Sequence, residues 1–135
     1  MSIIKFLELD SKVDNRGYLG ILESTRHIPF DIKRIYFLKN LQSDIPRGFH
    51  THKKLIQAAV CISGNYEMIL DDGKNKESVA LNSSHSPLLI EPLIWHEMQN
   101  FSHDCIILVL ASDFYFEDDY VRDYAQFLRM VNEEI

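Results

Sequence analysis

The chain has 135 residues, of which 46% are hydrophobic and 25% are charged. This balance is typical of a soluble globular protein, and the length fits one domain over residues 1–135. The formal net charge of −6 argues against a nucleic-acid partner held through phosphate contacts. Because no apolar stretch approaches the ~20 residues of a membrane span, and no signal peptide is evident, we expect a cytoplasmic protein with no membrane partner.

Short apolar or alternating runs, separated by turn residues, dominate most of the chain and predict many short strands. Asp14-Asn15-Arg16-Gly17 is a turn in which glycine supplies a positive φ, and Asp71-Asp72-Gly73 is a strong hairpin signal. The expected strands cover residues 3–9, 18–23, 32–38, 55–62, 66–70, 77–81, 88–91, 94–99 and 105–111.

The C-terminal part of the chain changes to a helical period. Apolar and aromatic residues recur at helical spacing from Tyr120 to Val131, and the acidic run 117–119 suits the positive end of such a helix. Strands at short spacing followed by one helix predict a sandwich or a small antiparallel β-barrel. The first strand, 3–9, would leave an open edge, so we predict a homodimer in which this strand is exchanged.

Three histidines are the candidates for a functional site. His50 and His52 are two residues apart, so on a strand they point to the same face. Gly48, just before them, permits a bulge or a close backbone approach. His96 lies on a distant strand. We expect the three imidazoles to line one cavity.

These residues lie in motifs that resemble a known family. His50-x-His52 followed by Gln57 resembles the first cupin motif, and Pro92 with His96 and Asn100 resembles the second. Further blocks, spread over nearly the whole chain, are similar to the dTDP-4-keto-6-deoxyhexose 3,4-ketoisomerases. The blocks are Asp14-x-Arg16-Gly17, Ile28-Pro29-Phe30-x-Ile32-Lys33-Arg34, Pro46-Arg47-Gly48-Phe49-His50-x-His52-Lys53-Lys54, Leu70-Asp71-Asp72-Gly73, Trp95-His96-Glu97-Met98 and Leu110-Ala111-Ser112-Asp113.

The resemblance implies an all-β fold, a cupin-type antiparallel β-barrel (jelly roll) with a C-terminal helix. It implies a homodimer that converts dTDP-4-keto-6-deoxyglucose into a dTDP-linked 3-keto sugar, without cofactor or metal. Such sugars lead to 3-amino-3,6-dideoxyhexoses of bacterial surface glycans. By resemblance, His50, His52 and Tyr36 are expected to be catalytic, and Arg16, Arg47, Lys53, Trp95 and His96 to bind substrate.

The chemistry of this reaction suits paired histidines. Moving the ketone from carbon 4 to carbon 3 requires removal of the carbon-3 proton, an enediol, and reprotonation at carbon 4. Each transfer needs a group that accepts and donates protons near neutral pH, and histidine does this best. His50 is expected to act at carbon and His52 at the oxygens, with Tyr36 donating to the enolate. Arg16 and His96 resemble the group whose product has an axial carbon-4 hydroxyl (galacto or xylo-hex-3-ulose type).

Other functions are compatible with the same motifs. His50, His52 and His96 are the ligand set of a metal-dependent cupin, although Gln57 replaces the usual glutamate and an amide is a poorer ligand. A non-enzymatic sugar-binding cupin would leave the paired histidines unexplained. A 3,5-epimerase would pair one histidine with a catalytic tyrosine.

Overall fold

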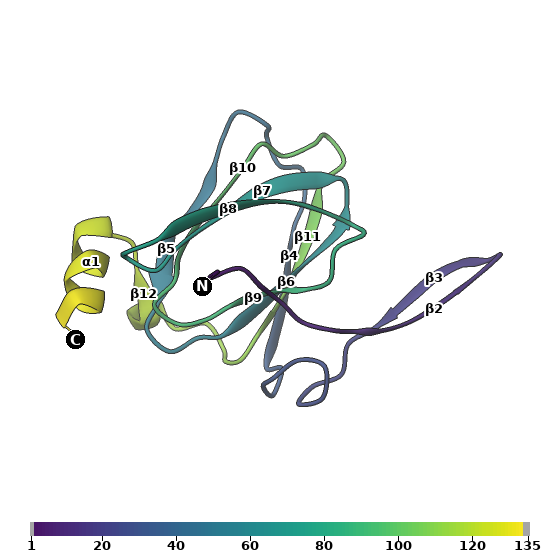
Figure 1. The fold of residues 1–135 in the computed structure, drawn as a ribbon, viewed down its shortest axis with the longest axis horizontal. Coiled ribbons are helices and arrows are strands. Elements are labelled where there is room, and N and C mark those ends of the chain that lie inside the picture. The colour runs from purple at the N-terminus through teal and green to yellow at the C-terminus, as the bar shows by residue number, and fades with distance from the viewer. Residues whose placement is uncertain (1, 134–135) are drawn as a thin grey trace.

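The computed structural model describes residues 2–133, in which two antiparallel sheets lie face to face (Figure 1). One sheet has the strand order β1-β9-β6-β11-β4, and the other has the order β12-β5-β10-β7-β8. Their bounds are β1 Lys5–Phe6, β4 Arg34–Leu38, β5 Arg47–His52, β6 Gln57–Ser63, β7 Asn65–Asp71, β8 Lys76–Asn82, β9 Leu88–Ile90, β10 Trp95–Gln99, β11 Ile106–Ala111 and β12 Tyr120–Val121. The all-β jelly-roll prediction is confirmed as a sandwich, because no strand pairing within residues 2–133 joins the two sheets into a closed barrel.

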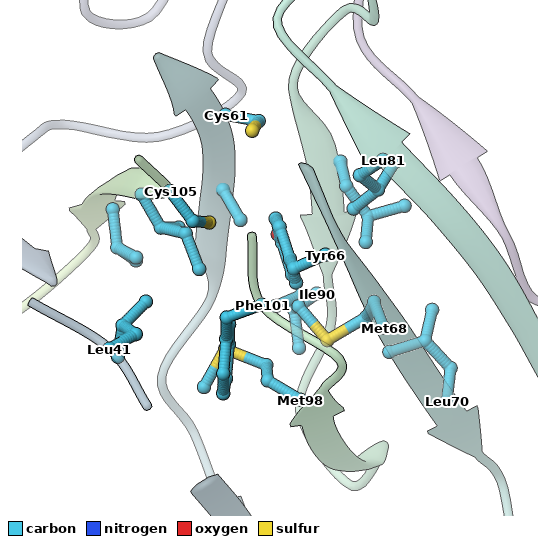
Figure 2. Packing of buried hydrophobic residues seen from close by; sticks show 14 residues of the cluster. Leu41, Cys61, Tyr66, Met68, Leu70, Leu81, Ile90, Met98, Phe101 and Cys105 are labelled. Carbon is cyan, nitrogen blue, oxygen red and sulfur yellow. The ribbon is translucent and has the colours of Figure 1, made fainter. Parts of the chain in front are cut away.

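A hydrophobic core fills the space between the sheets (Figure 2). Met68 and Leu70 of β7 face it from one sheet, and Ala59 of β6 and Val109 of β11 face it from the other. Each strand contributes every second residue, since successive side chains on a strand point to opposite faces. Residues of the cluster are largely withdrawn from water; Met68 is 1% exposed, for example.

The remaining strands form a hairpin that projects from the sandwich (Figure 1). β2 (Asp10–Asp14) pairs with β3 (Gly17–Ile21), and within residues 2–133 neither strand pairs with another. The predicted turn at Arg16 and Gly17 lies at its tip, where Gly17 has a φ of 135°. The sequence did not predict β2, because all five of its residues are exposed and show no buried alternation.

The N-terminal segment differs from the prediction of one strand over 3–9. Only Lys5 and Phe6 form a strand, and they pair with Leu89 and Leu88 of β9 in the same chain. The strand is thus paired within this chain, and its exchange between subunits stays a prediction. The element that lacks a partner sheet is instead the β2–β3 hairpin.

The C-terminal helix α1 (Tyr124–Glu133) begins later than its period predicts. The acidic residues form a 3₁₀ turn, η1 (Glu117–Asp119), which leads into β12 rather than into the helix. The side chain of Asp123 caps the helix instead, since its Oδ1 accepts the backbone N–H of Ala125 at 2.9 Å. The helix packs its buried Phe127 against Trp95 of β10, with 5.7 Å between ring centroids.

Candidate active site

The backbone of β5 and β10 brings His50 and His96 together. The two residues are direct partners in the antiparallel pairing of these strands, and the register shifts between His96 and Glu97. Gly48 adopts a φ of 96°, and a Cβ at this position would lie 2.8 Å from the carbonyl oxygen of His96. Only glycine fits this close approach without displacement. The predicted role of Gly48 is therefore confirmed.

The three imidazoles form one tight cluster. The ring centroids of His50 and His96 are 4.5 Å apart, and those of His50 and His52 are 5.0 Å apart. One ring nitrogen of each residue lies within 4.8 Å of the other two. His52 and His96 are each only 3% exposed, whereas His50 is partly exposed.

The hydrogen bond of His50 defines its tautomer. Its Nδ1 lies 3.0 Å from the carbonyl oxygen of Gly48. A carbonyl can only accept, so Nδ1 carries the hydrogen and donates it, which leaves the lone pair of neutral His50 on Nε2. His96 has the same arrangement in weaker form, with Nδ1 3.4 Å from the carbonyl oxygen of Ile94. His50 therefore presents Nε2 as a proton acceptor.

Burial keeps the imidazoles neutral at pH 7. Desolvation lowers the pKa of His50, and the hydrogen bond to Gly48 opposes this shift. Desolvation also lowers the pKa of His52 to about 4 and that of His96 to about 3, and the neighbouring His50 lowers both further. Asp119 opposes the lowering of the His52 pKa, because its Oδ2 lies 3.6 Å from Nδ1 of His52. Neutral imidazole is the form that can accept a proton.

The cluster lies between two cavities that share Arg34 and Tyr120. The first, which we call the histidine cavity, has a volume of about 460 Å³ and is lined by His50, His96 and Arg47 among others. The second, the lysine cavity, has a volume of about 450 Å³ and is lined by His52 and Lys53. The prediction that all three histidines line one cavity thus holds for His50 and His96, whereas His52 lines the neighbouring lysine cavity, with its ring centroid 5.0 Å from that of His50. Both volumes lie in the range of small-molecule sites.

Tyr36 occupies the inner face of β4 and lines the histidine cavity. Its hydroxyl donates to Oε1 of Gln57, the first residue of β6. Burial raises the pKa of Tyr36, so the hydroxyl keeps its proton. Tyr36 thus lies in the cavity as predicted, but its hydroxyl is engaged by another side chain.

Two predicted substrate-binding residues lie elsewhere. Trp95 is 3% exposed and packs against Tyr124 and Phe127 of the helix, while its Nε1 donates to Glu97 at 2.9 Å. Adjacent residues on a strand face opposite ways, so the position that turns His96 inward turns Trp95 outward. Arg16 is at the tip of the hairpin and pairs with Asp14. Within this chain, neither residue reaches the histidine cavity.

Four residues that the sequence did not single out as site residues also line the histidine cavity: Arg34, Tyr115, Tyr120 and Arg122. Arg34 lies in both cavities, 5.3 Å from the ring centroid of Tyr36, and forms no ion pair within residues 2–133. Tyr120 touches the cluster, 4.3 Å from the His52 ring centroid. Arg34 and Tyr36 are two residues apart, and this shared strand face was the available signal.

Comparison with known proteins gives the family. The family model described as FdtA, WxcM-like, C-terminal, matches residues 2–132. The TDP-4-oxo-6-deoxy-alpha-D-glucose-3,4-oxoisomerase of Aneurinibacillus thermoaerophilus is 43% identical over 127 residues, which cover 94% of this chain and 91% of that protein.

Solved structures agree with this result. A 3,4-ketoisomerase from Helicobacter canadensis is 48% identical, with a TM-score of 0.92 over 98% of this chain and 99% of that one. A mutant of the 3,4-ketoisomerase QdtA from Thermoanaerobacterium thermosaccharolyticum, in complex with TDP-4-keto-6-deoxyglucose, is 34% identical, with a TM-score of 0.95 over 100% of this chain and 98% of that one. The epimerase RmlC from Legionella pneumophila, at 15% identity and a TM-score of 0.72 over 87% of this chain and 70% of that one, shares the fold. The chain belongs to the FdtA family of WxcM-like C-terminal domains.

Proposed function

We propose that this protein is a sugar-nucleotide 3,4-ketoisomerase that converts dTDP-4-keto-6-deoxyglucose into a dTDP-3-keto-6-deoxyhexose. The observation that carries the proposal is the hydrogen bond that Nδ1 of neutral His50 donates to the carbonyl oxygen of Gly48. This bond leaves the lone pair on Nε2, which can therefore act as the base. Relatives that cover almost the whole chain are named for this activity. The proposed domain is the entire chain, residues 1–135.

In the proposed reaction, Nε2 of His50 takes the proton from carbon 3, and the electrons of the broken C–H bond form a double bond between carbons 3 and 4. This leaves negative charge on the carbon-4 oxygen. His52 is the proposed partner for the oxygens: Asp119 near its Nδ1 favours the tautomer whose Nε2 is free, so Nε2 takes the proton of the carbon-3 hydroxyl and gives it to the carbon-4 oxygen. The carbon-3 oxygen then forms the new ketone while carbon 4 takes the proton held on Nε2 of His50.

Cations around the two cavities suit the diphosphate of the substrate. Arg47 lines the histidine cavity, Lys53 lines the lysine cavity, and Arg34 borders both. Guanidinium groups bind phosphate oxygens through paired hydrogen bonds. We propose that Arg47 and Arg34, which share the histidine cavity, hold the diphosphate, that Lys53 binds substrate from the lysine cavity, and that His96 shapes the sugar pocket beside His50.

We further propose a homodimer, formed through the β2–β3 hairpin. The hairpin exposes Val13, Tyr18 and Leu19, at 72%, 63% and 56%, although they are apolar or aromatic. Covering such side chains on a second copy would remove them from water. Arg16, at the hairpin tip, can bind substrate only if the hairpin reaches the site of the partner. A Leu19→Asp variant that scatters light as a monomer, beside a dimeric wild type, would support this arrangement; a monomeric wild type would refute it.

A metal-dependent reaction is less well supported by the donor set. The three imidazoles are close enough to share an ion. In the position where metal-binding cupins are expected to have glutamate, however, Gln57 already uses its Oε1 to accept the hydrogen bond of Tyr36. This carbonyl is a neutral oxygen, which is a poorer ligand for a divalent cation than the carboxylate of glutamate. We therefore propose a reaction that needs no metal and no other cofactor.

The proposed compartment is the cytoplasm, and the proposed pathway leads to a 3-amino-3,6-dideoxyhexose of a surface glycan. The described part of the chain has no helix that is long and apolar enough to span a membrane. Cys61 and Cys105 are buried free thiols, as is usual in a reducing compartment.

The direct test is incubation of the purified protein with dTDP-4-keto-6-deoxyglucose, followed by NMR of the product. We expect the carbonyl carbon to move from position 4 to position 3 while the nucleotide stays attached. Epimerisation at carbon 5, or substrate that stays unchanged although the protein binds dTDP, would exclude the proposed reaction. A His103→Gln variant is the matched control, because His103 is an exposed loop histidine outside both cavities.

A further inference from the structure

Gln57 is a buried amide beside the proposed base, and the reaction described above gives it no part. It is 1% exposed and lines the histidine cavity together with His50 and His96. Its Oε1 accepts the hydroxyl of Tyr36, but its Nε2 has no hydrogen-bond partner within residues 2–133. This Nε2 is itself withdrawn from solvent, and buried polar groups are nearly always paired, so the unpaired donor of a cavity-lining residue needs an explanation.

In this structure the amide of Gln57 is oriented by its contact with Tyr36. The hydroxyl donates to Oε1, so the oxygen of the amide is directed to Tyr36 of β4 and the NH₂ group occupies the other branch. Burial raises the pKa of Tyr36, which keeps this donor protonated throughout the neutral range. The amide is therefore held by an interaction that does not change with pH near neutrality.

We infer that Gln57 is a catalytic residue, whose Nε2 donates a hydrogen bond to the substrate oxygen that becomes negatively charged as His50 removes the carbon-3 proton. Tyr36 is then a positioning residue that aims the amide, rather than a direct donor to the enolate. This inference rests on the proposed ketoisomerase activity. It adds a preorganised donor at the point where negative charge develops.

The chemistry of the amide suits this role better than that of a carboxyl group. An amide NH₂ donates without titrating, so it does not compete for the protons that the histidines transfer. A glutamate in the same place would present negative charge to the developing enolate and repel it. The residue type at position 57 thus favours an enolate in the cavity.

Two substitutions at position 57 test the inference. Gln57→Leu removes the donor, and Gln57→Glu keeps the acceptor for Tyr36 while replacing the NH₂ group by an oxygen. We expect both to lower kcat about 100- to 1000-fold, the range seen when one such donor is removed. Binding of dTDP alone, measured by calorimetry, should stay within about twofold. Gln126→Glu adds the same charge on the exposed face of α1 and should retain wild-type kcat.

The pH dependence of Gln57→Glu separates catalysis from structure. A buried carboxyl that becomes protonated regains an O–H donor. We therefore expect the kcat of Gln57→Glu, divided by that of wild type, to rise as the pH is lowered. All assays contain chelator, because a carboxylate beside three imidazoles can bind a metal ion. A merely structural role for Gln57 would lower the melting temperature without this pH-dependent recovery.

Tyr36→Phe tests the positioning role. If Tyr36 acts through Gln57, Tyr36→Phe alone should lower kcat about tenfold, which is less than the loss in Gln57→Leu. In the Gln57→Leu background, adding Tyr36→Phe should lower kcat almost no further. Wild-type kcat in folded Gln57→Leu and Gln57→Glu would overturn the inference, as would additive losses in the double variant. Failure of wild type itself to convert dTDP-4-keto-6-deoxyglucose would instead reject the proposed function.

Discussion

The burial of His96 predicts a specific loss of stability in acid. Its pKa is lowered from 6.5 to about 3 in the folded protein, mainly because the ring is desolvated. As the pH falls below 6.5, the unfolded chain binds a proton at His96 and the folded protein does not. Protonation thus favours the unfolded state, and the stability that the neutral ring contributes is lost progressively down to pH 3.

The magnitude follows from the size of the shift. Each unit of pKa difference is equivalent to ~1.36 kcal/mol, so His96 alone lowers the free energy of unfolding by about 3 kcal/mol between pH 7 and pH 4. This is a large share of the ~5–15 kcal/mol that stabilises a typical domain. His96→Gln removes the titrating group and should flatten the pH dependence by this amount.

The assay is urea unfolding at pH 7, 6, 5 and 4, at one protein concentration. The chain has one tryptophan, and Trp95 is buried against the C-terminal helix, so its fluorescence reports unfolding. Comparing variants cancels the titration of carboxylates that all of them share. His103→Gln, an exposed loop substitution, should follow wild type. If the stability curves of wild type and His96→Gln run parallel from pH 7 to pH 4, His96 is not a buried neutral imidazole and the reasoning fails.

Three further predictions concern the reaction. His50→Asn should lower kcat on the order of 100- to 10,000-fold, the usual range for a general acid–base group, and dTDP binding by calorimetry should survive; near-wild-type kcat would reject His50 as the base. Extensive treatment with chelator should leave kcat unchanged, and loss of activity that a divalent ion restores would favour the metal-dependent alternative. The first product should be dTDP-3-keto-6-deoxygalactose, because Arg16 and His96 resemble the axial group; its gluco epimer, seen by NMR, would contradict this assignment.

Strands that cross the core could be predicted from the sequence, and strands outside it could not. β6, β7 and β11 carry apolar runs that must face a core, and the structure has strands there. β2 has no buried residue, so its pairing with β3 leaves no apolar pattern to read. The spacing of the aromatic residues predicts that Tyr120 begins a helix. In the structure, Tyr120 instead lies in the two-residue strand β12, which pairs with β5.

The histidine cluster could be predicted because two of its members share a strand face. His50 and His52 are at positions i and i+2, which is a local property of the chain. Which other side chains complete the site depends on strand order and register. Tyr120 reaches the cluster only because β12 pairs with β5, with Tyr120 opposite His52. Likewise, the free donor of Gln57 follows from its contact with Tyr36 across the sheet, which no sequence spacing specifies.

The central claim, that histidine moves a proton between two carbons of a bound keto sugar, is tested most directly by running the reaction in deuterium oxide. A proton held on the His50 imidazole can exchange with solvent before carbon 4 is reprotonated. We predict that NMR and mass spectrometry of the 3-keto product will find solvent deuterium at carbon 4. A His50→Asn variant that converts the substrate at the wild-type rate, with the same deuterium content at carbon 4, would contradict the account.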